Sequence, residues 1–146
     1  GSEMCIETDI WNTNVTSAIS LSQAVIPVFL KEGSGKIINI SSVWGSCGAS
    51  CETAYSATKG AVNTFTKALA KELAPSNIQV NAIACGIIDT KMNAHLTDED
   101  VKQIVDEIPA GRLGTPADVA KTVCALLTAS PYMTGQIITL DGGWTV

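Results

Sequence analysis

The stretch KIINISSVWGSCGASCETAYSATKGAVNTFTKALAKELAPSNIQVNAIA, which covers residues 36–84, combines two short apolar runs with one long helical pattern. Residues 36–40 and residues 78–84 are rich in β-branched side chains, and each run predicts a strand. Residues 53–74 between them form a helical pattern that Pro75 ends. Because two strands joined by a helix in this order form a right-handed crossover, the stretch predicts two parallel strands covered by a helix.

Strands and helices continue to alternate on both sides of this stretch. Four further elements are predicted: a helix over residues 10–31 with Asp9 as its N-cap, a short helix from Thr97 or Asp98 to about Glu107, a helix from Thr115 and Pro116 to about Leu127, and a strand over residues 136–140. The resulting order α-β-α-β-α-α-β predicts an α/β fold, the carboxyl-terminal part of a doubly wound, Rossmann-like parallel sheet.

The sequence contains no Gly-rich turn of the kind that binds a dinucleotide pyrophosphate at the start of such a sheet. Gly45 and Gly48 lie in a predicted loop, and no helix start follows them at the required place. We therefore expect residues 3–146 to be the back half of a larger domain whose amino-terminal nucleotide-binding half is absent. Residues 1–2, Gly1 and Ser2, resemble a cloning scar.

The composition is typical of one packed globular domain. The chain has 146 residues, 46% of them apolar, and its mean hydropathy is +0.26. The net charge of −5 and the lack of a basic stripe argue against a nucleic-acid partner. No uninterrupted apolar run reaches about 18 residues, so the sequence predicts neither a membrane span nor a signal peptide.

The five cysteines are odd in number and irregularly spaced, and no second Cys or His pair accompanies Cys47 and Cys51. These features favour reduced thiols in a cytoplasmic protein over disulfides or a metal site. The only histidine is His95. No motif gives it a role, and it is interpreted as a solvated surface residue.

Tyr55 and Lys59 are four positions apart near the start of the predicted 53–74 helix, so they lie on one face of it. A phenol with a pKa of about 10 is a poor acid near neutral pH, and a neighbouring ammonium favours the phenolate and lowers that pKa. Ser42 ends a predicted strand, where open α/β sheets bind their ligands. A serine hydroxyl there can donate to a substrate carbonyl, and Ser41 is an alternative for this role.

Five segments resemble the motifs of the short-chain dehydrogenase/reductase family. They are NTNVTSA over residues 12–18, IINISSVWGSCGASCETAYSATK over 37–59, VNAIACGIIDTKM over 80–92, IPAGRL over 108–113 with the following Thr115 and Pro116, and TGQIITLDGGW over 134–144. The resemblance extends over nearly the whole chain. It is closest to the 3-oxoacyl-[acyl-carrier-protein] reductases, enzymes of fatty acid biosynthesis.

The resemblance implies a role for each matching residue. Tyr55 would be the general acid that protonates the nascent alkoxide during reduction. Lys59 would lower the pKa of Tyr55 and hold the nicotinamide ribose, and both residues would contact the cofactor. Ser42 would orient and polarise the carbonyl, and Asn14 would hold a water that links Lys59 to solvent. Further cofactor contacts would come from Gly86, Ile88 and Thr90.

The resemblance therefore implies an oxidoreductase that uses NAD(P)H to reduce a ketone, such as a 3-oxoacyl thioester, to the 3-hydroxy form. NADP is the expected cofactor and NAD is not excluded, because the family distinguishes the two in the half that is absent here. The substrate would be a small or acyl-carrier-bound carbonyl compound. The protein would be a homodimer or homotetramer, and the isolated fragment is expected to be inactive.

Two features set this chain apart from the family pattern. Cys85 stands where the family usually has proline, which makes the turn after that strand less rigid. Without the missing half, residues 36–40 would expose an unpaired strand edge, a template for association. In the family, the helices that correspond to residues 10–31 and 53–74 form a dimer interface. The alternative function is therefore a non-catalytic truncated module that persists as an oligomer.

Overall fold

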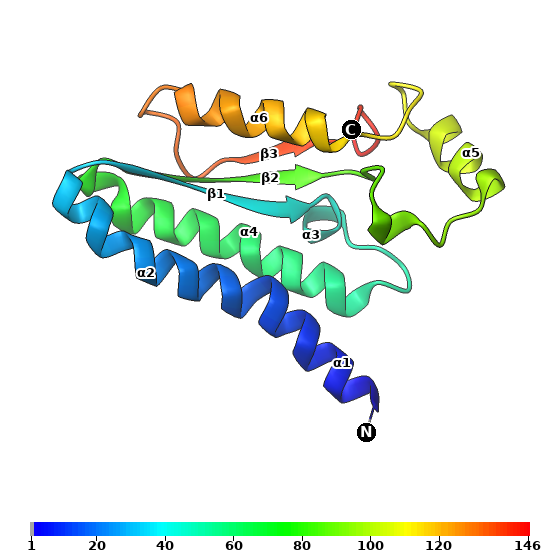
Figure 1. Cartoon of the computed structure of the whole chain (residues 1–146), viewed down its shortest axis with the longest axis horizontal. Coiled ribbons are helices and arrows are strands. Elements are labelled where there is room, and N and C mark those ends of the chain that lie inside the picture. Colours follow the sequence, from blue (N-terminus) through cyan, green and yellow to red (C-terminus); the bar gives the residue numbers. More distant parts are fainter. Residues whose placement is uncertain (1) are drawn as a thin grey trace.

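A three-stranded parallel sheet forms the centre of the molecule (Figure 1). The computed structural model describes the backbone from Ser2 to Val146 and the side chains from Glu7 onward. Gly1, half of the suggested cloning scar, lies outside the described residues. The strands β1 (Gly35–Ser42), β2 (Ile78–Cys85) and β3 (Ile137–Leu140) pair in the order β1-β2-β3.

Helices cover both faces of this sheet (Figure 1). On one face lie α2 (Ser17–Glu32) and α4 (Thr53–Leu73), and on the other lies α6 (Pro116–Thr128). The remaining helical segments are α1 (Ser2–Trp11), η1 (Asn12–Thr16), α3 (Trp44–Cys47), η2 (Ala74–Ser76), η3 (Lys91–Asn93) and α5 (Asp98–Glu107). The α/β class, the parallel sheet and the alternation of strands with long helices are therefore confirmed.

The middle strand β2 carries the core because both of its faces are covered. Every residue of β2 is buried, and Ile78, Val80 and Ile83 expose no surface. One apolar cluster packs α4 against Ile78 and Val80, and a second joins Ile83 to Leu126 of α6. A strand buried on both faces has a nearly continuous apolar sequence, which is the pattern of residues 78–84.

Three boundaries differ from the expectations. The first helical run begins at Ser2, and α1, the π-helical η1 and α2 follow one another without a break, so Asp9 lies inside a helix and is not an N-cap. Strand β1 continues to Ser42 because its ladder with β2 extends that far. The predicted loop over residues 41–52 contains the short helix α3. For β1 the ladder with β2 extends the strand into serines of weak intrinsic strand preference.

The helical run Glu7–Glu32 is long and apolar enough to cross a membrane by length and composition alone, although the sequence predicts no span. Only 11% of the tested window is buried. One such helix is a weak indication, because core helices and signal sequences meet the same criterion. Here one side of the run packs on α4 and β1, while Leu21 and Val28 stay 68% and 57% exposed.

Strand β1 has only one neighbour among the described residues. Its outer edge, the one directed away from β2, is unpaired, and Ile40 on this strand is 48% exposed. Unpaired edges with apolar side chains favour association with another chain or segment.

Candidate active site

The carboxyl ends of the strands form the floor of the candidate site. Ser42 and Cys85 are direct partners in the parallel ladder of β1 and β2, and the Val43 N–H donates to the Cys85 carbonyl over 3.0 Å. The chain then leaves β2 at Gly86, whose N–H donates to the Leu140 carbonyl of β3 over 2.9 Å. Open α/β sheets bind ligands at this edge.

Tyr55 and Lys59 lie together on the first turns of α4, beside this floor. The Lys59 Nζ is 5.6 Å from the centroid of the Tyr55 ring and donates to the Ile40 carbonyl over 3.2 Å. Both side chains are half-buried and line the same cavity. The structure therefore brings the phenol and the ammonium together, as their spacing predicts.

Ser42 faces the Tyr55 hydroxyl, whereas Ser41 does not. The Ser42 side chain hydrogen-bonds Tyr55, and its Oγ accepts the N–H of Trp44 over 3.2 Å. The Ser41 Oγ instead donates to Asn63 Oδ1 of α4 over 2.6 Å. The geometry therefore favours Ser42 for the carbonyl-binding role that the sequence leaves open between the two serines.

A close approach of α3 to α4 holds the backbone at Lys59 in place. A Cβ atom added to Gly45 would lie 2.6 Å from the carbonyl carbon of Lys59 and 2.9 Å from the nitrogen of Gly60. Contacts this short require glycine. A residue that looks like part of a flexible loop in the sequence is thus a packing contact behind the lysine.

Asn14 lies behind the site and does not line it. Its Nδ2 donates to the Oγ1 of Thr58 over 3.0 Å, and the buried Thr58 hydroxyl donates to the Tyr55 carbonyl over 2.7 Å. Asn14 belongs to the π-helical segment η1, which breaks the regular turn at this contact. The structure connects Asn14 to the backbone that carries Tyr55 and Lys59, and the water relay remains a prediction.

A cavity of about 380 Å³ opens at the strand ends. The candidate residues Ser42, Tyr55, Lys59, Gly86, Ile88 and Thr90 all line it. Two residues of α6, Pro116 and Val119, complete the wall. Six of the seven sequence-predicted site residues therefore share one cavity, and the seventh, Asn14, is connected through Thr58 to the Tyr55 backbone.

The lining of this cavity fits the nicotinamide half of a dinucleotide. Ile88 and Val119 supply apolar walls suited to a flat ring, Gly86 offers backbone without a side chain, and Lys59 offers donors for ribose hydroxyls. The described residues include no Gly-rich turn for the pyrophosphate. They also include no group of three or more His, Cys, Asp or Glu side chains that could hold a metal ion.

Burial shifts the pKa values of the two principal groups in opposite directions. Burial raises the pKa of Tyr55; the hydrogen bond with Ser42 lowers it, and the nearby Cys85 and Glu52 raise it further. Burial lowers the pKa of Lys59, and Cys85 partly offsets this. Desolvation is the largest influence on the pKa of Tyr55, and the Lys59 ammonium donates to the Ile40 carbonyl. That Lys59 lowers the pKa of Tyr55 stays a prediction.

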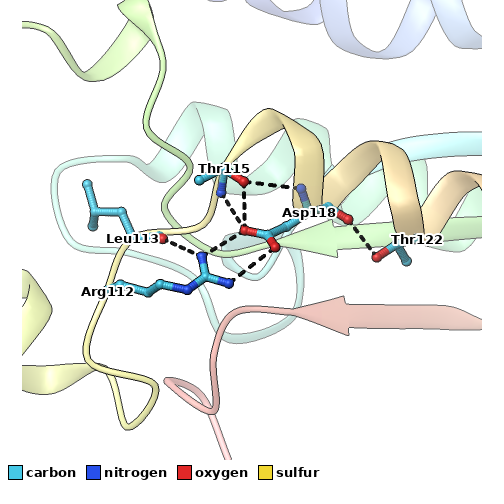
Figure 2. Close-up of polar contacts among 5 residues, drawn as sticks. All are labelled: Arg112, Leu113, Thr115, Asp118 and Thr122. Atoms are coloured by element: carbon cyan, nitrogen blue, oxygen red, sulfur yellow. Dashed lines mark hydrogen bonds and ion pairs between the residues drawn. The ribbon is translucent and has the colours of Figure 1, made fainter.

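The amino end of α6, which borders the cavity, is fixed by a compact polar network (Figure 2). The Arg112 guanidinium donates to both carboxylate oxygens of Asp118, over 2.7 and 3.2 Å. Thr115 and Asp118 form a capping box, in which each side chain accepts the backbone N–H of the other. The N-cap that the Thr115-Pro116 pair predicts is confirmed.

A second cavity, of about 200 Å³, adjoins the first, and both are lined by Ser42 and Tyr55. Its lining includes Trp44, Glu52 and His95, none of which the motifs identify as site residues. His95 is exposed, as expected, but it borders this cavity rather than open surface alone. Trp44 lies in α3, Glu52 directly precedes α4 and His95 follows η3, so only the folded chain brings the three together.

A family model described as enoyl-(acyl carrier protein) reductase matches residues 7–145, which include Ser42, Tyr55 and Lys59. This chain belongs to that family, within the short-chain dehydrogenases/reductases. The match covers the helices, the sheet and both cavities described above, so the short-chain dehydrogenase/reductase resemblance read from the five segments is confirmed.

Curated relatives agree with this assignment to the short-chain dehydrogenases/reductases. The chain is 46% identical over 132 residues to the uncharacterized oxidoreductase YmfI of Bacillus subtilis, covering 90% of this chain and 54% of the relative. It is 45% identical over 136 residues to the 3-oxoacyl-[acyl-carrier-protein] reductase FabG of Haemophilus influenzae, covering 92% and 56%. The chain thus spans about half the length of the curated relatives it matches.

Solved structures of short-chain dehydrogenases/reductases share the fold. The 3-oxoacyl-[acyl-carrier protein] reductase of Brucella melitensis superposes with a TM-score of 0.85 at 37% identity. That match covers 94% of this chain and 54% of the other. This chain therefore has the same Rossmann-like fold as that reductase and corresponds to about half of its length.

Proposed function

We propose that this chain is the catalytic half of an NAD(P)H-dependent reductase that converts a ketone, such as a 3-oxoacyl thioester, to the 3-hydroxy form. The observation that supports this most strongly is the shared cavity of Ser42, Tyr55 and Lys59. In it a hydroxyl for the carbonyl oxygen, a phenol and an ammonium meet at the carboxyl ends of parallel strands.

Each residue has one task in the proposed reaction. The bound nicotinamide supplies a hydride to the carbonyl carbon. Ser42 donates a hydrogen bond to the carbonyl oxygen, and Tyr55 transfers its hydroxyl proton to that oxygen, so that the C=O bond becomes a C–OH. The resulting phenolate is stabilised by the Lys59 ammonium. It would regain a proton from solvent by way of Lys59 and a water held by Asn14. The raised pKa of Tyr55 keeps the phenol protonated in the resting site, as a general acid requires.

NADP is the proposed cofactor and NAD the alternative. Gly86, Ile88 and Thr90, together with Tyr55 and Lys59, would hold the nicotinamide half. The adenosine half would need a Gly-rich turn that these residues do not supply. We therefore propose that the isolated chain does not turn over. It would act in the cytoplasm, as a homo-oligomer, on a small or acyl-carrier-bound carbonyl substrate.

The first prediction concerns Tyr55 and tests the proposed function. The nucleotide-binding part of the Bacillus subtilis relative is joined to this chain, and NADPH-dependent reduction of a 3-oxoacyl thioester is followed at 340 nm. Tyr55→Phe should lower kcat by about 10²- to 10⁴-fold, the usual share of a general acid. Tyr132→Phe is the matched control, because Tyr132 is 99% exposed and lines neither cavity.

Two results would contradict the proposal. Equal turnover in Tyr55→Phe and the unchanged protein would remove the phenol from the reaction. Micromolar NADPH binding by the 146-residue chain alone would show that it contains an adenosine site, against the view that half of the nucleotide site is missing. Binding of reduced nicotinamide mononucleotide, which lacks the adenosine, is consistent with the proposal.

A second candidate function is favoured by the unpaired edge of β1. On this view the chain is a non-catalytic module that persists as an oligomer. The joined protein distinguishes the two candidates, because a non-catalytic module would show no Tyr55-dependent reduction there.

A further inference from the structure

The second cavity, which adjoins the first at Ser42 and Tyr55, contains one carboxylate. Glu52 lines this cavity, and its carboxylate is close enough to Tyr55 to raise the pKa of the phenol. Among the described residues Glu52 makes no side-chain hydrogen bond and no ion pair, and no Lys or Arg lines the cavity. The carboxylate is therefore available to a ligand in this space.

An aromatic side chain forms part of the lining of the same cavity. The Trp44 indole lines it and is held from behind by Trp144, with the ring centroids 5.0 Å apart and the planes at 67°. The Trp144 Nε1 in turn donates to Glu107 of α5 over 3.4 Å. Trp44 is thus held against Trp144 at the wall of the cavity rather than being a freely rotating surface side chain.

A carboxylate and an indole at one cavity form a site for positive charge. An ammonium group gains Coulomb attraction from the carboxylate and cation–π attraction from the indole. The cavity on the cofactor side has the opposite character, because Lys59 lines it. An anionic cofactor and a cationic substrate would therefore favour different cavities, the first beside Lys59 and the second beside Glu52, which meet at Ser42 and Tyr55.

We propose that the substrate is a ketone that carries a positively charged amine or ammonium group, bound by Glu52 and Trp44 while Ser42 and Tyr55 hold its carbonyl. This inference rests on the proposed function, because it takes these two hydroxyls as the carbonyl site. It narrows the ketones of the proposed function to those whose group beside the carbonyl is cationic, because an anionic group in this cavity would be repelled by the Glu52 carboxylate.

The test uses three ketones that differ mainly in charge. Trimethyl(2-oxopropyl)ammonium is the cation, 4,4-dimethylpentan-2-one is its uncharged isostere, and 4-oxopentanoate is the anion. Their dissociation constants for the 146-residue chain are measured by ligand-observed NMR at pH 8, where an ordinary imidazole is neutral. An ion pair at a half-open site and a cation–π contact together should favour the cation over the isostere by about tenfold.

Glu52→Gln removes the charge and keeps the size of the side chain. It should reduce the cation preference to about threefold, the share left to Trp44, and weaken the discrimination against the anion. Trp44→Leu should remove the cation–π share instead. Glu72→Gln is the matched control, because it removes the same net charge at a residue that is exposed on α4 and lines neither cavity.

Any of three results would overturn the inference. The first is that the unchanged chain shows no preference for the cation over the isostere, or no detectable binding of the cation. The second is that the full preference persists in Glu52→Gln, and the third is that Glu72→Gln loses as much of that preference as Glu52→Gln does. Failure of the proposed function is a separate result. Ligand binding requires no hydride transfer, whereas the proposed function fails only if the joined protein shows no Tyr55-dependent reduction of the neutral isostere or thioester.

Discussion

Desolvation sets the acid–base behaviour of single residues at this site. Tyr55 and Lys59 each lose water on the half-buried face of α4, and burial favours the neutral form of both. The phenol consequently stays protonated to higher pH, while the ammonium gives up its proton more readily than a free lysine. For a reductase this polarity suits a proton donor that is resupplied through a neighbouring amine.

The second prediction is a titration of Tyr55. Phenolate absorbance at 295 nm is followed with pH in the unchanged chain and in Tyr55→Phe, and the difference between the curves isolates Tyr55. Its midpoint should lie above the ordinary value of 10.0. Because the native pKa is raised, the protonated Tyr55 hydroxyl contributes to the free energy of unfolding. That contribution is full below pH 10 and is lost as the pH rises through the native pKa. A midpoint below 10 would instead show that Lys59 dominates.

At the scale of elements, the site depends on how closely α3, α4 and α6 approach the strand ends. Gly45 permits the contact of α3 with α4 at Lys59. The capping network of Arg112, Thr115 and Asp118 fixes the start of α6 beside the cofactor-side cavity. None of these four residues lines that cavity, so they act on the site by positioning the helices that do.

The third prediction concerns the approach of α3 to α4. Gly45→Ala should destabilise the chain by about 1–3 kcal/mol, because the new methyl group meets backbone atoms that cannot rotate away. Urea unfolding monitored by circular dichroism measures this. Gly60→Ala is the control: its Cβ would meet only the Gly45 oxygen, at 3.3 Å, and alanine favours a helix interior. Equal stability of Gly45→Ala and the unchanged chain would contradict the packing argument.

The fourth prediction concerns Asp118 at the start of α6. The hydrogen bonds from Arg112 and from Thr115 hold the pKa of this carboxyl well below its usual range. Its contribution to stability should therefore be full at pH 5 and above, and be lost as the pH falls below about 3.9 toward the native pKa. Urea midpoints of Asp118→Asn and the unchanged chain should differ at pH 7 and converge at low pH. Asp106→Asn, which removes the same charge from an exposed position outside the network, should leave the urea midpoint at pH 7 unchanged.

At the scale of the whole molecule, the chain exposes more surface than its mass requires. The accessible surface is 8855 Å², whereas a compact monomer of 15.2 kDa exposes about 7,100 Å². The excess is of the order of a standard protein–protein interface. Exposed apolar side chains on α2 and the free edge of β1 account for part of it, and the same outer side of α2 makes the run Glu7–Glu32 long and apolar enough to resemble a membrane span.

The fifth prediction follows from that excess surface. The chain should be a dimer or larger at micromolar concentration, measured by size-exclusion chromatography with light scattering. Placing charge on the exposed side of α2 by Leu21→Glu together with Val28→Glu should shift it toward the monomer, because both side chains lie on one helix face. Tyr132→Glu, at a fully exposed loop position, should not. A monomeric, folded chain at high concentration would contradict the prediction.

Local rules explain most of what could be predicted. The Thr115-Pro116 start of α6 and the capping box at Thr97 need only a few neighbouring residues, and both are present. The ends of β1 and of the first helical run were missed, because Ser41 and Asp9 have weak intrinsic preferences that pairing and continuity override. The burial that raises the pKa of Tyr55 could not be predicted, because burial is a property of the packed molecule.

The amino-acid sequence alone determined the alternation of strands and helices, the parallel sheet, the family, and the Tyr55–Lys59 pair, since each depends on periodicity or on residues a few positions apart. Tertiary structure alone decided that Ser42 rather than Ser41 meets the phenol, that Asn14 bonds Thr58, and that Glu52 and Trp44 border the second cavity. The physical reason is distance along the chain: contacts between residues far apart in sequence form only when the sheet and helices pack, and no local pattern records them.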